Sequence, residues 1–153
     1  MTAIVIGQYF KVPPLKIKAA IENYVPSNNR SQIIQRDGNT FILDAYNANP
    51  TSMKNVLDYF KSYPAKNKIA ILGDMLELGK DSLQEHQELL NYIEKFNFKQ
   101  VLLVGEQFSA CSAPNLCFKT VKELKAWMAQ QEFHNIHFLI KGSRGIRLEQ
   151  VLE

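Results

Sequence analysis

The stretch KIAILGDMLELGKDSLQEHQELLNYIEKFNFKQVLLV, residues 68–104, decides the fold class. It opens and closes with short, continuously apolar runs at 69–72 and 101–104, and between them Leu89, Leu90 and Ile93 recur at helical spacing. An apolar strand, an amphipathic helix and a second apolar strand form the unit from which parallel sheets are built. Continuously apolar strands are expected where helices cover both faces of the sheet. The stretch therefore predicts an α/β fold.

The same alternation extends outward from about residue 32 to the C-terminus. It predicts a Rossmann-like, mostly parallel sheet with helices on both faces. The predicted strands are 32–35, 40–44, 68–72, 100–104, a weaker 116–119, and 136–140.

Local signals mark where the helices begin. Asn49-Pro50 places a capping residue before a proline at the first helical position. Segments 82–85 (SLQE) and 120–123 (TVKE) match capping boxes, in which a hydroxyl and a Glu side chain satisfy free amides at a helix start. A last helix is expected from about Arg144, with Leu148 and residues 151–152 facing inward.

The first thirty residues fit this pattern poorly. Residues 2–10 and 15–24 predict a short helical segment of two helices around Val12-Pro13-Pro14, followed by a polar stretch at 26–31. We place a domain boundary near Ser31. Two helices cannot bury a core alone, so this segment either packs on the sheet or belongs with another domain.

Composition excludes several classes of protein. The 153 residues carry a net charge of +3, and the basic residues are scattered along the sequence rather than gathered in a stripe, which disfavours nucleic acid. No apolar run approaches the ~20 residues needed to cross a bilayer. We expect a soluble, cytoplasmic chain with no membrane insertion. Cys111 and Cys117 form no CxxC pair and are expected to be reduced thiols, with no metal site.

Three polar clusters follow predicted strands, where parallel sheets place their ligand crevice. In the first, Asp44 offers a carboxylate for ribose hydroxyls, Tyr46 offers a ring for a base, and Asn49 precedes free helix amides that favour an anion. The alternatives are a turn-forming Asp44, a surface Tyr46 and an Asn49 that only caps. The sequence is compatible with either set of roles.

The other two clusters are 73–79 (GDMLELG) and 141–145 (KGSRG). Asp74 and Glu77 are spaced to share a cation or to hold a loop shut, although solvated turn residues fit equally, and His86 follows in the next helix. Lys141 and Arg144 flank a hydroxyl at a helix start, which favours an anion, and the alternative is a solvated basic loop. The chain has no GxxxxGK[ST], GxGxxG, GxSxG or HExxH motif, so it holds at most part of an active site.

Read together, the segments NNRSQ (28–32), DAYNANP (44–50), GDMLELG (73–79) and KGSR (141–144) resemble the motifs of the Mur ligase family. DAYNANP and KGSR resemble in particular the branch that adds D-alanyl-D-alanine to a UDP-N-acetylmuramoyl-tripeptide. Enzymes of this family have three domains, and the chain resembles the last one. The resemblance implies that residues 1–31 are the terminal helices and hinge of a central ATPase domain, and that 32–153 are the C-terminal Rossmann-like domain.

The resemblance also implies a reaction and its participants. ATP would phosphorylate the tripeptide carboxylate, and the dipeptide amine would attack the resulting acyl phosphate. ATP is the implied cofactor, with Mg²⁺ held mainly by the central domain. The implied partners are both substrates and the other two domains of the same enzyme, which is expected to be a monomer.

The resemblance to the Mur ligase family also implies roles for individual residues. Arg30 matches an arginine at the hinge that reaches the ATP phosphates, which is a catalytic and a nucleotide-binding role. Asp44 matches the acid that holds the ribose, with Tyr46, Asn47 and Asn49 beside the nucleotide. The last set is implied to meet the dipeptide carboxylate, and it comprises Lys141, Ser143 and Arg144.

Two other classes of protein remain as alternatives. A receiver-like domain also places an acid and a lysine at strand ends, here Asp74 and Lys141, but residues 35–38 do not supply the second acidic pair it needs. A non-catalytic nucleotide-binding module would keep the fold without the chemistry.

Overall fold

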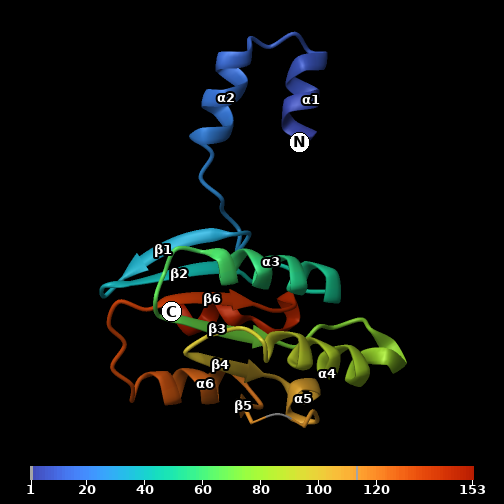
Figure 1. Ribbon diagram of the computed structural model, residues 1–153, viewed down its shortest axis with the longest axis vertical. Coiled ribbons are helices and arrows are strands. Elements are labelled where there is room, and N and C mark those ends of the chain that lie inside the picture. The colour runs from blue at the N-terminus through green and yellow to red at the C-terminus, as the bar shows by residue number, and fades with distance from the viewer. Residues whose placement is uncertain (1, 113) are drawn as a thin grey trace.

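The computed structural model describes residues 2–112 and 114–153. A six-stranded sheet with the order β1-β2-β6-β3-β4-β5 forms its centre (Figure 1). β1 pairs antiparallel with β2, and every other neighbouring pair is parallel, which confirms the predicted mostly parallel sheet. The strands are β1 Gln32–Arg36, β2 Asn39–Asp44, β3 Lys68–Gly73, β4 Gln100–Val104, β5 Leu116–Phe118 and β6 His137–Lys141.

Helices cover both faces of this sheet, as predicted. Residues of β3 alternate between two cores: Ala70 and Leu72 face one, and Ile69 and Ile71 face the other. The first core is closed by α3 Pro50–Ser62, α4 Ser82–Ile93 and α5 Glu106–Ser109, and the second by α6 Val121–Met128 and the 3₁₀ helix η3 Leu148–Leu152.

The connections define where a ligand crevice opens. The segments after β2 and β3 cross to the face of α3 and α4, whereas the segment after β6 crosses to the opposite face. Ligands of doubly wound sheets bind at such a switch point, beyond the carboxyl ends of the strands. The carboxyl end of β6, between β2 and β3, is therefore the place to look for a site.

All three predicted helices begin where expected, and two of the three predicted caps are confirmed. Asn49 caps α3, where its side chain accepts from the Ser52 amide at 2.8 Å. Thr120 caps α6 by accepting from the Glu123 amide at 3.2 Å. The capping box at 82–85 is wrong, because Ser82 is already the first residue of α4 and its hydroxyl donates to Gln107 Oε1 at 3.0 Å instead.

The last predicted helix is also wrong in type. The chain forms two 3₁₀ turns, η2 Arg144–Ile146 and η3, separated by Arg147 at φ 58°. A left-handed residue ends one helix and cannot continue it, so no α-helix spans this segment. Leu148 is nevertheless buried in the second core, as its inward position predicts.

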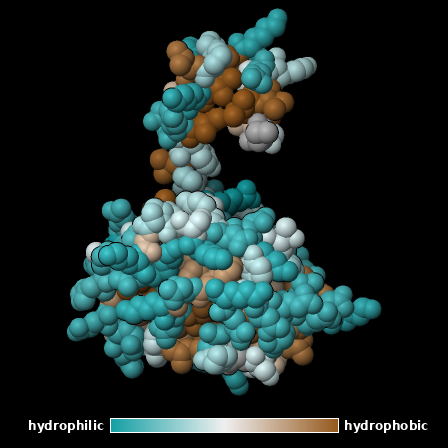
Figure 2. Space-filling view, viewed as in Figure 1, coloured by the Kyte–Doolittle hydropathy of each residue, from teal (hydrophilic) through white to brown (hydrophobic). Residues whose placement is uncertain are grey.

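The N-terminal segment stands apart from the sheet (Figure 1). Helices α1 Thr2–Tyr9 and α2 Pro14–Glu22 pack against one another, confirming the two predicted helices, and none of their residues is buried. Apolar side chains gather on this pair (Figure 2). The chain enters the sheet at Gln32, next to the boundary predicted near Ser31. Among the described residues, no helix is long and apolar enough to span a membrane.

Candidate functional site

The last residues of β2 and β6 form an ion pair at the switch point. Lys141 Nζ lies 2.7 Å from Asp44 Oδ2 and also donates to the Asn47 carbonyl at 3.0 Å. Lys141 is only 3% exposed, whereas Asp44 is half-buried. A buried ammonium needs such compensation. The pair therefore fixes the direction of the Asp44 carboxylate and the path of the loop after β2.

The segment that precedes β1 reaches the same carboxylate. The Ser31 amide donates to Asp44 Oδ1 at 3.0 Å. Two strong donors thus occupy Asp44, one on each oxygen. An ionised carboxylate offers about four lone-pair directions, so Asp44 keeps acceptor capacity for hydroxyl groups of a ligand.

Two arginines from distant parts of the chain meet on the ring of Tyr46. The guanidinium carbon of Arg30 lies 3.9 Å from the ring centroid, and that of Arg144 lies 5.3 Å from it. A pocket of about 470 Å³ opens beside them, with two fixed positive charges on its wall. Guanidinium groups bind phosphate and carboxylate groups with charge-assisted hydrogen bonds. The residues that line the pocket are Tyr24, Ser27, Asn28, Asn29, Arg30, Tyr46, Arg144 and Glu149.

Glu149 is one of the pocket residues, with Tyr24 and Ser27, that the sequence did not predict. Its Oε2 is buried and has no hydrogen-bond partner among the described residues. An unsatisfied buried oxygen costs free energy, so a donor at this position would stabilise the site. Glu149 carries no motif signal, because in sequence it lies among the residues expected to form an ordinary C-terminal helix.

Asn47 and Asn49 both use their side-chain oxygens locally. Asn47 Oδ1 accepts from the Ala48 amide at 2.8 Å, and Asn49 Oδ1 caps α3 as described above. Both residues are exposed. They lie close to Tyr46 in the loop that follows β2, which ends at Asp44. Their contact with a nucleotide stays a prediction.

The three residues expected at the dipeptide carboxylate divide into two buried positions and one exposed one. Ser143 accepts from the Leu76 amide at 2.9 Å, and its own amide donates to the Asp74 carbonyl at 3.1 Å. Ser143 therefore fastens the loop after β6 to the loop after β3. Lys141 is buried against Asp44, and Arg144 alone is exposed. Direct contact of the three with a dipeptide stays a prediction.

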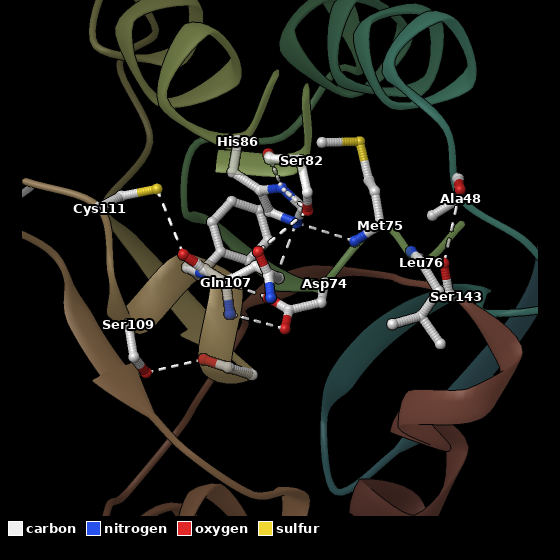
Figure 3. A network of polar contacts seen from close by, with 12 residues as sticks. Ala48, Asp74, Met75, Leu76, Ser82, His86, Gln107, Ser109, Cys111 and Ser143 are labelled. Atoms are coloured by element: carbon white, nitrogen blue, oxygen red, sulfur yellow. Dashed lines mark hydrogen bonds and ion pairs between the residues drawn. The ribbon is translucent and has the colours of Figure 1, made fainter. Parts of the chain in front are cut away.

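Asp74 and His86 form a buried network away from this pocket (Figure 3). The Asp74 carboxylate accepts from the amides of Gln107 and Phe108 at 2.9 and 3.0 Å. The His86 ring accepts at Nε2 from the Met75 amide at 3.0 Å, while its Nδ1 lies 2.6 Å from the Ser82 carbonyl. Only the tautomer with its proton on Nδ1 satisfies both contacts.

These contacts give Asp74 and His86 a structural role. They tie the loop after β3 to α4 and α5, and both side chains are almost completely buried. Glu77 is exposed and has φ 66°. The receiver-like alternative does not fit, because Lys141 pairs with Asp44 and the Asp74 carboxylate is held by backbone amides.

Both cysteines are free thiols. Partial burial, with smaller contributions from Asp74 and Cys117, raises the pKa of the Cys111 thiol above its ordinary value. Across residues 2–112 and 114–153, no group of three or more His, Cys, Asp or Glu side chains is arranged to hold a metal ion.

Comparison with known proteins agrees with this fold. The family model described as Mur ligase, glutamate ligase domain, matches residues 29–143. A UDP-N-acetylmuramoyl-tripeptide--D-alanyl-D-alanine ligase of Rickettsia prowazekii is 38% identical over 83% of the chain and 30% of its own length. The ligase of the same name from Haemophilus influenzae is 33% identical over 89% of the chain and 32% of its own length.

Solved structures that resemble this fold also come from MurF ligases. The crystal structure of MurF from Acinetobacter baumannii matches 96% of the chain and 34% of its own length, with 27% identity and a TM-score of 0.78. MurF ligase from Thermotoga maritima, solved in complex with ADP, has a TM-score of 0.79 over 97% of the chain and 35% of its own length. Its identity is 20%, so it supports the fold alone.

Fold and site together define an α/β domain with a polar, cationic crevice at the carboxyl edge of a mostly parallel sheet. The chain belongs to the Mur ligase family, over the part that its glutamate ligase domain model describes. It spans about a third of the length of the curated relatives it matches.

Proposed function

We propose that this chain is the C-terminal domain of the ATP-dependent ligase that adds D-alanyl-D-alanine to UDP-N-acetylmuramoyl-tripeptide during peptidoglycan precursor synthesis in the cytoplasm. One observation carries the proposal: relatives with this activity in their names align with 83% and 89% of the chain, and the family model spans the polar strand ends at 44–50 and 73–79. The convergence of Asp44, Tyr46 and Arg144 on one edge of the sheet supports it.

The proposal divides the chain at the linker. Residues 1–31 would be the end of a central ATPase domain with its hinge, and residues 32–153 the C-terminal domain. In support, α1 and α2 expose several large apolar side chains, contain no buried residue and do not pack on the sheet. Such a helix pair needs another surface to bury its apolar side chains.

The proposed reaction activates a poor electrophile. The terminal tripeptide carboxylate takes the γ-phosphoryl group of ATP, which releases ADP and forms an acyl phosphate. The dipeptide amine then attacks the carbonyl carbon, and phosphate and a proton leave as the amide forms. Closure of two domains around the reactants would position them for both steps.

The nucleotide would bind to the accessible groups at the carboxyl ends of β2 and β6. Asp44 retains acceptor capacity for the ribose hydroxyls, and Lys141 holds its carboxylate in place. Tyr46, Asn47 and Asn49 lie on the same loop and would flank the nucleotide. Arg30, now over the Tyr46 ring, supplies a fixed charge that can offset phosphate charge during transfer. Mg²⁺ would be held mainly by the central domain, since the chain has no P-loop.

The dipeptide carboxylate would meet the turn after β6. Arg144 is the exposed cation there. Ser143 and Lys141 would hold the turn that carries Arg144 in place, because both are buried and hydrogen-bonded to neighbouring loops. This assignment makes Arg144 the direct contact and gives the two buried residues positions next to it.

Complementation of growth tests the proposed function. The chain would replace the C-terminal third of the H. influenzae ligase in cells whose own copy of that ligase can be switched off. Growth is expected with the chimera and not with the truncated ligase alone. A chimera that accumulates to normal levels yet supports no growth would favour a non-catalytic module.

A further inference from the structure

Four lysines that are scattered in sequence gather at the opposite end of the sheet. They surround a pocket of about 280 Å³ between the end of α3, the start of β3 and the end of α4. No acidic side chain is among the described residues that line it. The lining residues are Lys61, Ala65, Lys66, Lys68, Lys95, Asn97 and Phe98.

Lys68 gives this pocket a buried positive charge. Its side chain belongs to a residue that is 9% exposed, and its Nζ donates to the carbonyls of Phe60 and Lys61 at the end of α3. No carboxylate lies within 4.0 Å of this ammonium in the described part of the chain. An ammonium has three donors, so one remains after these two bonds.

The other three lysines are exposed and make no ion pair within residues 2–112 and 114–153. The carboxyl ends of α3 and α4 point here, and each contributes roughly half a negative charge. Four ammonium groups against about one compensating charge leave a clear positive excess. Buried charges in proteins are normally paired, and the buried Lys68 ammonium has carbonyl acceptors but no carboxylate partner among the described residues, so an anion in this pocket would stabilise it.

We propose that this lysine pocket binds a compact phosphate-class oxyanion, either free phosphate or pyrophosphate or the phosphate of a lipid head group. Lysine recognises such groups as a point charge, and the Asn97 amide offers a further donor. The pocket lies at the amino end of β3. Asp44 and Lys141 lie at the carboxyl ends of the parallel strands β2 and β6, which is the opposite end of the sheet. The proposal is therefore independent of the proposed ligase function.

The test is a titration of the ¹⁵N-labelled chain with sodium pyrophosphate at constant ionic strength, with sodium chloride as the reference. Saturable shifts are expected at the amides of Lys66, Asn97 and Phe98. The double substitution Lys66→Gln with Lys95→Gln should weaken this binding at least tenfold. The matched control, Lys122→Gln with Lys125→Gln, removes two exposed charges from α6 and should leave the binding unchanged.

A second arm distinguishes the two sources of phosphate. Vesicles of phosphatidylglycerol are compared with vesicles of phosphatidylcholine by cosedimentation. Cosedimentation that the Lys66/Lys95 substitutions abolish assigns a lipid head group, and pyrophosphate binding without it assigns a free anion. The proposal is overturned if pyrophosphate shifts these amides no more than chloride does and neither vesicle binds. Shifts confined to Tyr46 and Arg144 would overturn it too, because they report the other edge of the sheet.

Discussion

Asp44 and Lys141 are 97 positions apart in sequence, yet their side chains share one ion pair at the carboxyl edge of the sheet. This contact gives the two residues different roles. Lys141 is buried and acts on Asp44, whereas Asp44 keeps acceptor capacity toward a ligand. On the neighbouring turn, Arg144 is exposed and sits over Tyr46. Lys141 therefore positions other groups of the site, whereas Asp44 and Arg144 remain accessible to a ligand.

Replacement of Arg144 tests the dipeptide assignment. In a full-length chimera, Arg144→Ala should raise the KM for D-alanyl-D-alanine by about 10- to 150-fold, since a hydrogen bond to a charged group contributes about 1.5–3 kcal/mol. Arg147→Ala is the matched control, because Arg147 is also exposed and lies three residues away. Steady-state kinetics at saturating ATP gives the answer. An unchanged KM for the dipeptide would remove Arg144 from this role.

Alkylation of Cys111 tests its environment. Its raised pKa means that the folded protein keeps the thiol protonated to a higher pH than the unfolded chain does. Only the thiolate reacts, so iodoacetamide at pH 9 should label Cys111 several-fold more slowly in the folded chain than in urea. Peptide mass spectrometry over time measures both rates. Equal rates would show that the fold does not protect this thiol.

At the scale of elements, periodicity predicted most of the fold because both faces of the sheet are buried. The strand is continuously apolar at 69–72, and all six residues of β3 are buried. Local signals failed where a tertiary contact outweighs them. The Ser82 hydroxyl bonds Gln107, 25 positions away, and so does not cap α4. Arg147 adopts a left-handed conformation that no sequence pattern marks, and it divides the expected C-terminal helix.

The start of α5 depends on a glycine. Gly105 has φ 127°, and a Cβ there would lie 2.2 Å from the Asp74 carboxylate, which bonds the first amides of α5. Gly105→Ala should therefore cost more than the 1–3 kcal/mol, roughly, of backbone strain alone.

Gly79→Ala is the control for this prediction, because Gly79 also has positive φ but a Cβ there meets nothing within 4 Å. It should cost only about 1–2 kcal/mol. Urea denaturation of both variants compares the two costs. Equal losses of stability would mean that the Asp74 carboxylate moves aside at little cost.

At the scale of the whole molecule, the sequence predicted which segments come together at the ends of the strands, but not the contacts among their side chains. The candidate segments 44–50 and 141–144 each begin at the last residue of a strand, so the parallel pairing of β2 with β6 brings them together, whereas Arg30 precedes β1. The contacts of Arg30 with Tyr46, and the place of Glu149 in the pocket, depend on the linker path and the 3₁₀ turns. The lysine pocket was hidden for the same reason, since its members come from three separate elements.

The isolated chain should have no ligase activity. It lacks a P-loop, and the two cations of its pocket cannot replace a full phosphate cradle. We expect no ADP release when the purified chain is incubated with ATP, the UDP-sugar tripeptide and the dipeptide, and at most weak binding of ADP by calorimetry. Ligase turnover by the chain alone would contradict the proposal that a separate central domain binds the ATP phosphates.

The most direct measurement joins the chain to the N-terminal and central domains of the H. influenzae ligase and follows ADP release. ADP release is expected to require both the UDP-sugar tripeptide and D-alanyl-D-alanine, and a single amino acid should not support it. The same two domains without the chain should show only background. A chimera that folds and binds ATP and the tripeptide, yet releases no additional ADP when the dipeptide is added, would contradict the central claim.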